Sequence, residues 1–117
     1  MSKLEEMTRL FEENADSAKA QVMSAYMKNR FSFYGIQTPK RRALYKSFLA
    51  NEKKSEKIDW ASLKQVWQDD HHECQYLVLD YLRTMQRFLT YDDIEKLEYF
   101  ARSKQWWGPT AVQPSRI

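Results

Sequence analysis

The chain has little of what β-rich folds, disulfide-bonded domains and membrane proteins require. Its 117 residues include 2 glycines and 3 prolines, too few for the tight turns of a β-sandwich or a Rossmann domain. A single cysteine, Cys74, excludes an intramolecular disulfide and a cysteine-based zinc site. No apolar run approaches the roughly 20 residues that cross a bilayer, so we expect no membrane partner. The N-terminus is charged and lacks an apolar signal core, which favours a cytoplasmic location.

The composition instead indicates one helical domain. Hydrophobic residues make up 43% of the chain and charged residues 30%, the balance of a folded globular protein. Apolar spacing and capping residues predict six helices joined by short polar loops. Five are expected over residues 3–13, 17–29, 38–51, 59–67 and 71–88, and the sixth is expected to begin at residue 90.

Capping residues predict where several of these helices begin. Asp16 or Ser17 can cap the second helix, and Asp59 can cap the fourth. Thr38 is expected to cap the third through its side chain, with proline following where a missing N–H costs nothing. The segment Thr90–Asp93 resembles a capping box before the last helix.

The apolar residues of each helix predict the face that it buries. The second helix would use Ala18, Val22, Ala25 and Tyr26. The strongest stripe lies on the fifth, with Cys74, Leu77, Val78, Tyr81, Leu82, Met85 and Leu89. In the last helix the inward residues would be Ile94, Leu97, Phe100 and Ala101.

The six helices are expected to form three antiparallel pairs, beginning near residues 3, 38 and 71. This spacing, about 33 to 35 residues, is typical of helix pairs stacked as a HEAT-like α-solenoid. No repeated sequence relates the pairs, so a plain helical bundle is left open. Residues 1–107 would form the N-terminal helical repeats and 108–117 an irregular tail. Two tryptophans beside that tail would leave a large apolar area in water, so we expect an all-α fold truncated at its C-terminus.

Basic residues are concentrated in one part of the chain. Between Lys19 and Lys54 nine lysines and arginines face one acid, Glu52, which gives this segment a charge of +8. The whole chain is +3, so the remainder carries −5. Such asymmetry is typical of phosphate binding, although a solvated basic face gives the same count. The third helix would carry four of the nine on its polar side, namely Lys40, Arg41, Arg42 and Lys46.

A few residues on the helices invite a functional interpretation that their surroundings do not support. His71 and Cys74 have a spacing that suits metal ligands, but two ligands make a weak site, and we expect no metal. Asp80 interrupts an apolar stripe and is predicted to be the buried partner of a basic group. Trp60 and Trp67 are predicted to be packing residues.

Three segments carry a resemblance to a known family. They are AYMKNRFSFYGIQTPKRRAL at 25–44, ECQYLVLDYL at 73–82 and ARSKQWW at 101–107. Together they resemble the N-terminal half of the AlkD-type DNA alkylation repair enzymes, and the resemblance covers residues 3–107. It implies a HEAT-like solenoid whose basic concave face binds double-stranded DNA carrying alkylated bases. It also implies a glycosylase that excises purines such as 3-methyladenine and 7-methylguanine by N-glycosidic hydrolysis, without a metal or nucleotide cofactor.

The resemblance also implies which residues contact DNA. Trp107 falls at the family's active-site tryptophan, and Tyr26 matches an aromatic residue that lines the same cleft. Gln37, Thr38 and Arg42 match positions that lie against the DNA backbone, where a helix N-terminus can bind a phosphate. With the neighbouring basic residues, the expected DNA-binding set is Tyr26, Lys28, Arg30, Gln37, Thr38, Lys40, Arg41, Arg42 and Trp107.

The resemblance assigns roles to two acidic residues, and this chain has only one of them. The family's catalytic Asp follows the paired Trp directly or three residues later, where this chain has Gly108 and Ala111. We therefore expect no glycosylase activity from these 117 residues as written. A reading frame or a clone that departs from the family just after Trp107 would explain the missing Asp, and a natural truncation would give the same protein sequence. The family pattern has Arg-Glu at residues 72 and 73, which indicates a structural role for Glu73.

An alternative interpretation belongs to a different class. A helical-repeat module could bind a protein partner through the aromatic residues Phe31–Tyr34 and the tryptophans Trp106 and Trp107. A homodimer that covers the tryptophan end would favour this alternative.

Overall fold

The computed structural model describes residues 3–29 and 31–103, and this part of the chain is helical. The predicted all-α fold is confirmed. Two short 3₁₀ helices lie between the last two α-helices, η1 at Gln86–Phe88 and η2 at Tyr91–Asp93. The α-helices are α1 (Lys3–Glu13), α2 (Ser17–Tyr26), α3 (Thr38–Ser55), α4 (Trp60–Trp67), α5 (His72–Thr84) and α6 (Ile94–Ser103).

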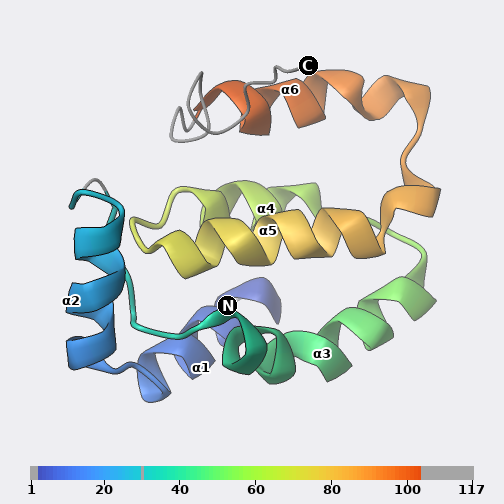
Figure 1. Cartoon of the computed structure of the whole chain (residues 1–117). Helices are drawn as coiled ribbons and strands as arrows, with labels where there is room; N and C mark the ends of the chain where they lie inside the picture. The colour runs from blue at the N-terminus through green and yellow to red at the C-terminus, as the bar shows by residue number, and fades with distance from the viewer. Residues whose placement is uncertain (1–2, 30, 104–117) are drawn as a thin grey trace.

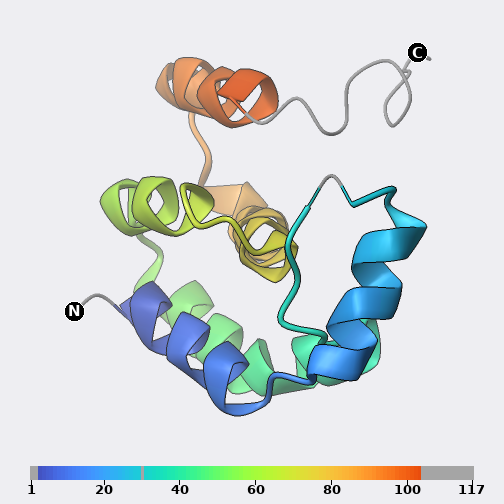
Figure 2. The same ribbon diagram turned by 90° about the vertical axis from the view of Figure 1, so that its left-hand side faces the viewer.

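The helices stack in three layers, which Figures 1 and 2 show from two sides. α1 and α3 form the base, α4 and α5 the middle layer, and α6 lies on top, while α2 stands beside the stack. α1 packs against α3 and α4, and α5 packs against the same two helices. This is a solenoid-like arrangement, as the spacing of the helices predicts. None of the helices in the described ranges has both the length and the apolar character needed to cross a membrane.

Aromatic residues join the middle layer to the top layer. Trp67 is fully buried, and the centroid of its ring lies 5.2 Å from that of Phe100 on α6. Its indole N–H donates a hydrogen bond of 2.6 Å to the hydroxyl of Ser103. Trp60 is stacked 6.2 Å from the same phenylalanine. The prediction that both tryptophans are packing residues is confirmed.

α2 differs from its prediction in its end and in its face. Asp16 caps it as predicted, because its carboxylate accepts a hydrogen bond of 3.1 Å from the backbone of Lys19. The helix ends at Tyr26 rather than at residue 29, since residues 28 and 29 have left-handed φ angles of 60° and 57°. The predicted inward face is wrong: α2 has no buried residue, and Val22 and Tyr26 are 69% and 86% exposed. The helix stands beside the layers, so it has no core to face.

α3 is longer than predicted because a tertiary contact holds its polar end. The expected loop from residue 51 is wrong, and the helix continues to Ser55 before Glu56 adopts a left-handed φ of 59°. Glu52 is buried, accepts a hydrogen bond of 3.1 Å from the hydroxyl of Tyr81, and pairs with Lys3 at 3.3 Å. The segment therefore packs on α5 and α1, although its residues are mostly polar.

α5 confirms its predicted stripe, and α6 confirms only part of its own. α5 ends at Thr84 instead of residue 88, and a 3₁₀ turn follows, as is common at helix ends. The capping box at Thr90–Asp93 is confirmed, but it opens the 3₁₀ turn that precedes α6. Phe100 faces inward as predicted. Ile94 and Ala101 do not, because Ile94 is the first residue of the helix and Ala101 is turned about 100° from Phe100.

Candidate nucleic-acid interface

One buried carboxylate holds the connection between α2 and α3, residues 31–37. Glu73, in the first turn of α5, is fully buried. It accepts hydrogen bonds from the backbone N–H groups of Tyr34 (2.9 Å), Gly35 (3.0 Å) and Ile36 (3.1 Å). The structural role predicted for Glu73 is confirmed. These bonds fix the position of the chain directly before α3.

The aromatic rings of this connection pack within the chain. Tyr34 is buried and stacks on His71, with ring centroids 3.7 Å apart. Phe31 stacks on His72 at 4.5 Å, and Phe33 meets the same imidazole edge-on at 5.4 Å. Tyr34 is therefore not available to the aromatic surface of the alternative interpretation, whereas Phe31 and Phe33 are only half-buried, so that interpretation stays a prediction. The other part of that surface, at residues 106 and 107, lies outside the described residues.

The first turn of α3 is exposed and begins differently from the prediction. Gln37 occupies the N-cap position in an extended conformation, and Thr38 is the first helical residue. The predicted cap by Thr38 is wrong, because its hydroxyl accepts a hydrogen bond of 3.3 Å from the Nη1 of Arg41. Gln37, Thr38 and Lys40 are all exposed, so the positive end of the helix dipole and a lysine reach water together.

Arg41 lies inside the protein, where its guanidinium has several partners. It is 4% exposed, and its Nε donates a hydrogen bond of 3.0 Å to the hydroxyl of Tyr45. Its Nη2 lies 3.6 Å from an oxygen of Asp80, and its guanidinium carbon lies 4.4 Å from the ring centroid of Tyr76. The expected position on the polar side is wrong, because Arg41 shares the inward face of α3 with Tyr45 one turn later.

The adjacent Arg42 points out of the protein. Its side chain is 56% exposed, and its Nε lies 3.5 Å from the same oxygen of Asp80. The hydroxyl of Tyr45 also donates to this oxygen. The prediction that Asp80 pairs with a basic group is confirmed, with two arginines as its partners. One carboxylate facing two guanidinium groups leaves a net positive charge, and Arg42 carries it at the surface.

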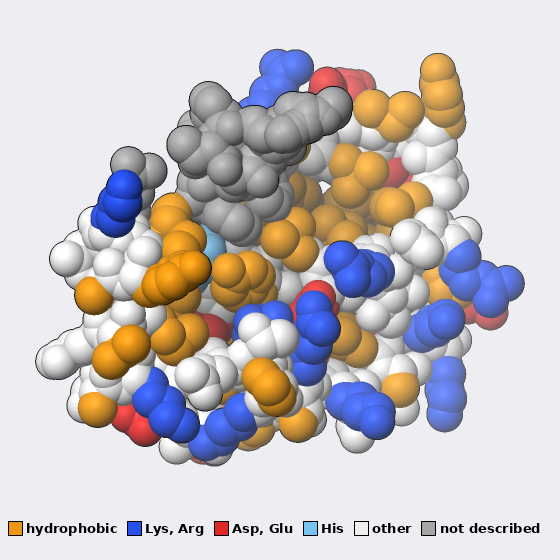
Figure 3. All heavy atoms as spheres, in the orientation of Figure 1, with side chains coloured by type: hydrophobic (Ala, Val, Ile, Leu, Met, Phe, Trp, Pro, Cys, Tyr) orange, Lys and Arg blue, Asp and Glu red, His pale blue; other side chains and the backbone are white. Residues whose placement is uncertain are grey.

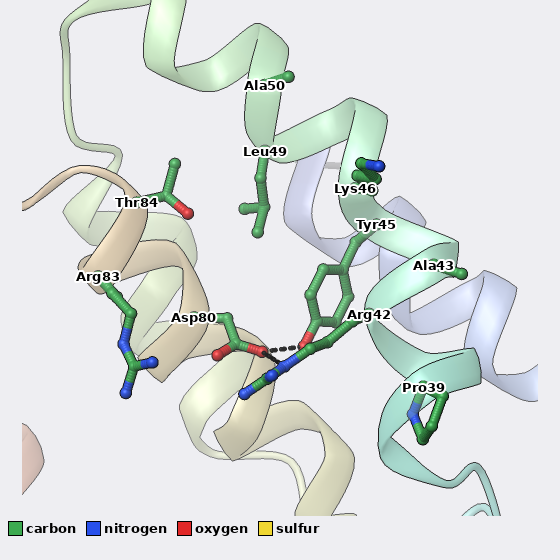
Figure 4. A pocket seen from close by; sticks show the side chains of 10 residues that line it. All are labelled: Pro39, Arg42, Ala43, Tyr45, Lys46, Leu49, Ala50, Asp80, Arg83 and Thr84. Atoms are coloured by element: carbon green, nitrogen blue, oxygen red, sulfur yellow. Dashed lines mark hydrogen bonds and ion pairs between the residues drawn. The ribbon is translucent and has the colours of Figure 1, made fainter.

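A groove of about 580 Å³ runs between α3 and α5 beside these residues (Figure 4). We call it the basic groove. Arg42 and Arg83 flank Asp80 from α3 and α5, and Lys46 lies further along α3. Figure 3 displays the face of the molecule seen in Figure 1, on which lysine and arginine side chains outnumber the acids. The groove is lined by Pro39, Arg42, Ala43, Tyr45, Lys46, Leu49, Ala50, Asp80, Arg83 and Thr84.

Most of the basic segment seen in the sequence reaches the surface. Arg41 is buried, and Arg30 lies outside the described residues. The remaining basic residues of the segment are exposed: Lys19, Lys28, Lys40, Arg42, Lys46, Lys53 and Lys54.

Two further residues of the expected DNA-binding set are placed at the end of α2, and Trp107, like Arg30, is not described. Tyr26 is almost fully exposed, and Lys28 follows it in the left-handed turn. Trp107 lies outside the described part of the chain, and the dimer expected to cover it is therefore not tested. The DNA-binding roles of the whole set therefore stay predictions.

Arg83 is the groove residue that the sequence analysis missed. It lies on α5, outside the basic segment between Lys19 and Lys54. A usable signal was present, because Arg83 follows Asp80 by three residues and so shares its helix face.

The two residues with metal-ligand spacing are separated by their surroundings. Cys74 is fully buried, and burial strongly raises the pKa of its thiol. His71 instead has its Nδ1 2.8 Å from the carboxylate of Asp69. Across residues 3–29 and 31–103, no group of three or more His, Cys, Asp or Glu side chains is arranged to hold a metal ion.

The buried tyrosines make the fold sensitive to high pH. Burial raises the pKa of Tyr45 and of Tyr81 to about 12, from the ordinary value of 10.0. The folded protein thus favours the neutral phenols, and their contribution to stability is complete below pH 10 and is lost as the pH rises towards 12. We expect the free energy of unfolding, measured with urea, to fall above pH 10. The fall should be shallower in Tyr45→Phe, and an equal fall in both proteins would contradict the role of Tyr45.

The fold and this face define a class, an all-helical layered protein with a basic groove along one side. The comparison with known families then identifies the chain more closely. A family model described as DNA alkylation repair enzyme matches residues 7–110. The chain therefore belongs to this family, which gives it a role in DNA alkylation repair and makes DNA its partner. No curated protein matches the chain.

Proposed function

We propose that the described part of the chain binds the backbone of double-stranded DNA through the basic groove and the first turn of α3. The observation that carries the proposal is the position of Arg42, half exposed at the groove beside an exposed helix N-terminus. Helix N-termini and arginines are the groups that bind phosphate oxygens most readily. Lys40, Lys46 and Arg83 extend the same positive surface.

Such contacts position a protein on DNA without reading its sequence. Phosphates are identical along the duplex, so lysines and arginines that bind them give affinity rather than base preference. A repair protein needs this property, because a damaged base can occur in any sequence. The choice of lesion would then depend on residues other than those of the basic groove.

The chemistry that the resemblance implies is hydrolysis of the N-glycosidic bond of an alkylated purine. We assign binding rather than hydrolysis to these 117 residues, since Gly108 and Ala111 occupy the positions expected for the catalytic Asp. No metal or nucleotide cofactor is required for this reaction in the family that the chain resembles. A DNA partner would place the protein in the bacterial cytosol or nucleoid.

Substitution of the two adjacent arginines tests this proposal. Arg42→Ala should weaken binding to a fluorescently labelled duplex about three- to tenfold and reduce the slope of log K against log salt by about 0.9, the value for one phosphate contact. Arg41→Ala should instead lower the free energy of unfolding by about 1–3 kcal/mol, because it removes a buried partner of Asp80. Binding is measured by fluorescence anisotropy and stability by urea unfolding.

A matched control removes one positive charge at another place. Arg102 lies on α6 and pairs with Glu98 at 3.4 Å. Arg102→Ala should therefore leave DNA affinity nearly unchanged. Equal losses for Arg42→Ala and Arg102→Ala would mean that only net charge matters and would contradict the proposed groove. Affinity that does not respond to salt would contradict DNA backbone binding itself.

A further inference from the structure

We propose that Asp80 is a positioning residue, whose carboxylate holds the guanidinium of Arg42 at the edge of the basic groove in an orientation ready to bind a DNA phosphate. The inference rests on the proposed function, because the phosphate belongs to the duplex. Asp80 is an acidic residue in a groove that is proposed to bind an anion, and its charge alone would repel that ligand. Its presence there therefore requires a structural explanation.

The charge of Asp80 is balanced from inside the protein. Its side chain is 16% exposed, and the buried Arg41 lies 3.6 Å from its Oδ2. The guanidinium of Arg41 is itself fixed by Tyr45, Thr38 and the ring of Tyr76, so it is held beside the carboxylate. Asp80 and Arg41 thus form a nearly neutral pair, and the charge of Arg42 is left for a ligand.

The position of the carboxylate is also set from inside. The hydroxyl of Tyr45 donates to its Oδ2, the oxygen that faces both arginines. Three groups of α3 therefore meet one oxygen of α5, and two of them, Arg41 and Tyr45, are buried. A carboxylate held in this way is a fixed point against which a mobile surface side chain can be oriented.

Arg42 meets this fixed point with one edge of its guanidinium. Its Nε lies 3.5 Å from Asp80, and its side chain is 56% exposed. A guanidinium has five N–H donors, and the two Nη groups carry four of them. A contact through Nε leaves the Nη donors to form the paired bonds that arginine makes with phosphate. A long side chain also loses less rotamer freedom on binding when it is already restrained.

Asp80→Asn distinguishes positioning from simple charge. The substitution removes a negative charge from the groove, so electrostatics alone would tighten DNA binding. Positioning predicts the opposite, a loss of about three- to tenfold in affinity for an undamaged labelled duplex. The loss should disappear when the same change is made in Arg42→Ala. Asp70→Asn, which removes an exposed acid, should leave affinity equal or slightly tighter.

A second measurement does not require DNA. In the DNA-free protein, the Arg42 Nε–H, whose NMR signal is assigned by its loss in Arg42→Lys, should exchange with water more slowly than it does in Asp80→Asn. If the unmodified chain fails to bind the duplex, the proposed function fails, and this signal still decides whether Asp80 holds Arg42. An exchange rate that Asp80→Asn does not change overturns the inference.

Two binding results would also overturn it. One is tighter binding by Asp80→Asn, and the other is an equal loss with and without Arg42, which would indicate general damage to the fold. If Asp80→Asn does not fold, Arg42→Lys keeps the charge but removes the Nε contact. It should lose at least threefold in affinity, and an unchanged affinity would overturn the inference.

Discussion

Glu73→Ala is expected to lower the free energy of unfolding by about 3–5 kcal/mol, a large part of the total stability of a small domain. The substitution leaves the backbone N–H groups of residues 34, 35 and 36 without their acceptor in a buried place. Each such group costs about 1–3 kcal/mol. The measurement is urea unfolding followed by far-ultraviolet circular dichroism.

Glu73→Gln is the matched control for this prediction. It keeps the volume of the side chain and one oxygen acceptor, which can still accept the bonds from residues 35 and 36, while its NH₂ group replaces the oxygen that accepted from Tyr34. Its loss of stability should be smaller than that of alanine. A loss below about 1 kcal/mol for Glu73→Ala would mean that water replaces the carboxylate, and that the connection is held by its aromatic packing instead.

Gly35→Ala is expected to destabilise the protein by about 3 kcal/mol or more, because the position combines two constraints. The φ angle of Gly35 is +96°, a region that residues with a Cβ rarely adopt. A Cβ at this site would also lie 2.0 Å from the carbonyl oxygen of Asp16 and 2.8 Å from the backbone nitrogen of Ala20. Both atoms belong to the backbone at the start of α2, so the connection itself would have to move.

Thermal unfolding and DNA binding together test the second prediction. The midpoint of unfolding should fall clearly in Gly35→Ala, and DNA affinity should fall with it at temperatures where the fold is only partly populated. Gln37→Ala, two residues later at an exposed N-cap position, provides the stability control. Wild-type stability in Gly35→Ala would mean that α2 shifts at little cost. The close approach between Gly35 and the start of α2 would then contribute nothing to stability.

The sequence predicts the elements of this fold better than their ends. Apolar spacing together with capping residues placed all six helices, although α2 buries none of its residues and the buried face of α3 includes the charged residues Arg41 and Glu52. The end of α3 could not be read in this way, since its last turn is polar and is retained by the contact of Glu52 with Tyr81, 29 residues later. Local helix propensity cannot predict a contact between residues so far apart in the sequence.

The sequence also predicts some features of the candidate site and not others. The concentration of basic residues and the exposed start of α3 were evident from the sequence. The sequence did not indicate that Arg41 is buried while Arg42 is exposed. This difference depends on Tyr45, Tyr76 and Asp80, which contact Arg41 from two helices. The groove itself requires α5 to lie beside α3, so Arg83 became a candidate only once the helices were placed in space.

α2 forms a helix without adding to the core, and this has a thermodynamic consequence. The helix is held by its N-cap and by a hydrogen bond near each end. The backbone N–H of Asp16 donates to the carbonyl of Tyr34 at 2.8 Å, and the hydroxyl of Ser24 donates to the carbonyl of Phe31 at 2.9 Å. An element of this kind can open and close as a separate cooperative unit, at a cost well below that of global unfolding. Tyr26 therefore lies on an element that can adjust its position at a lower cost than the helices that form the core, to which the basic groove is fixed.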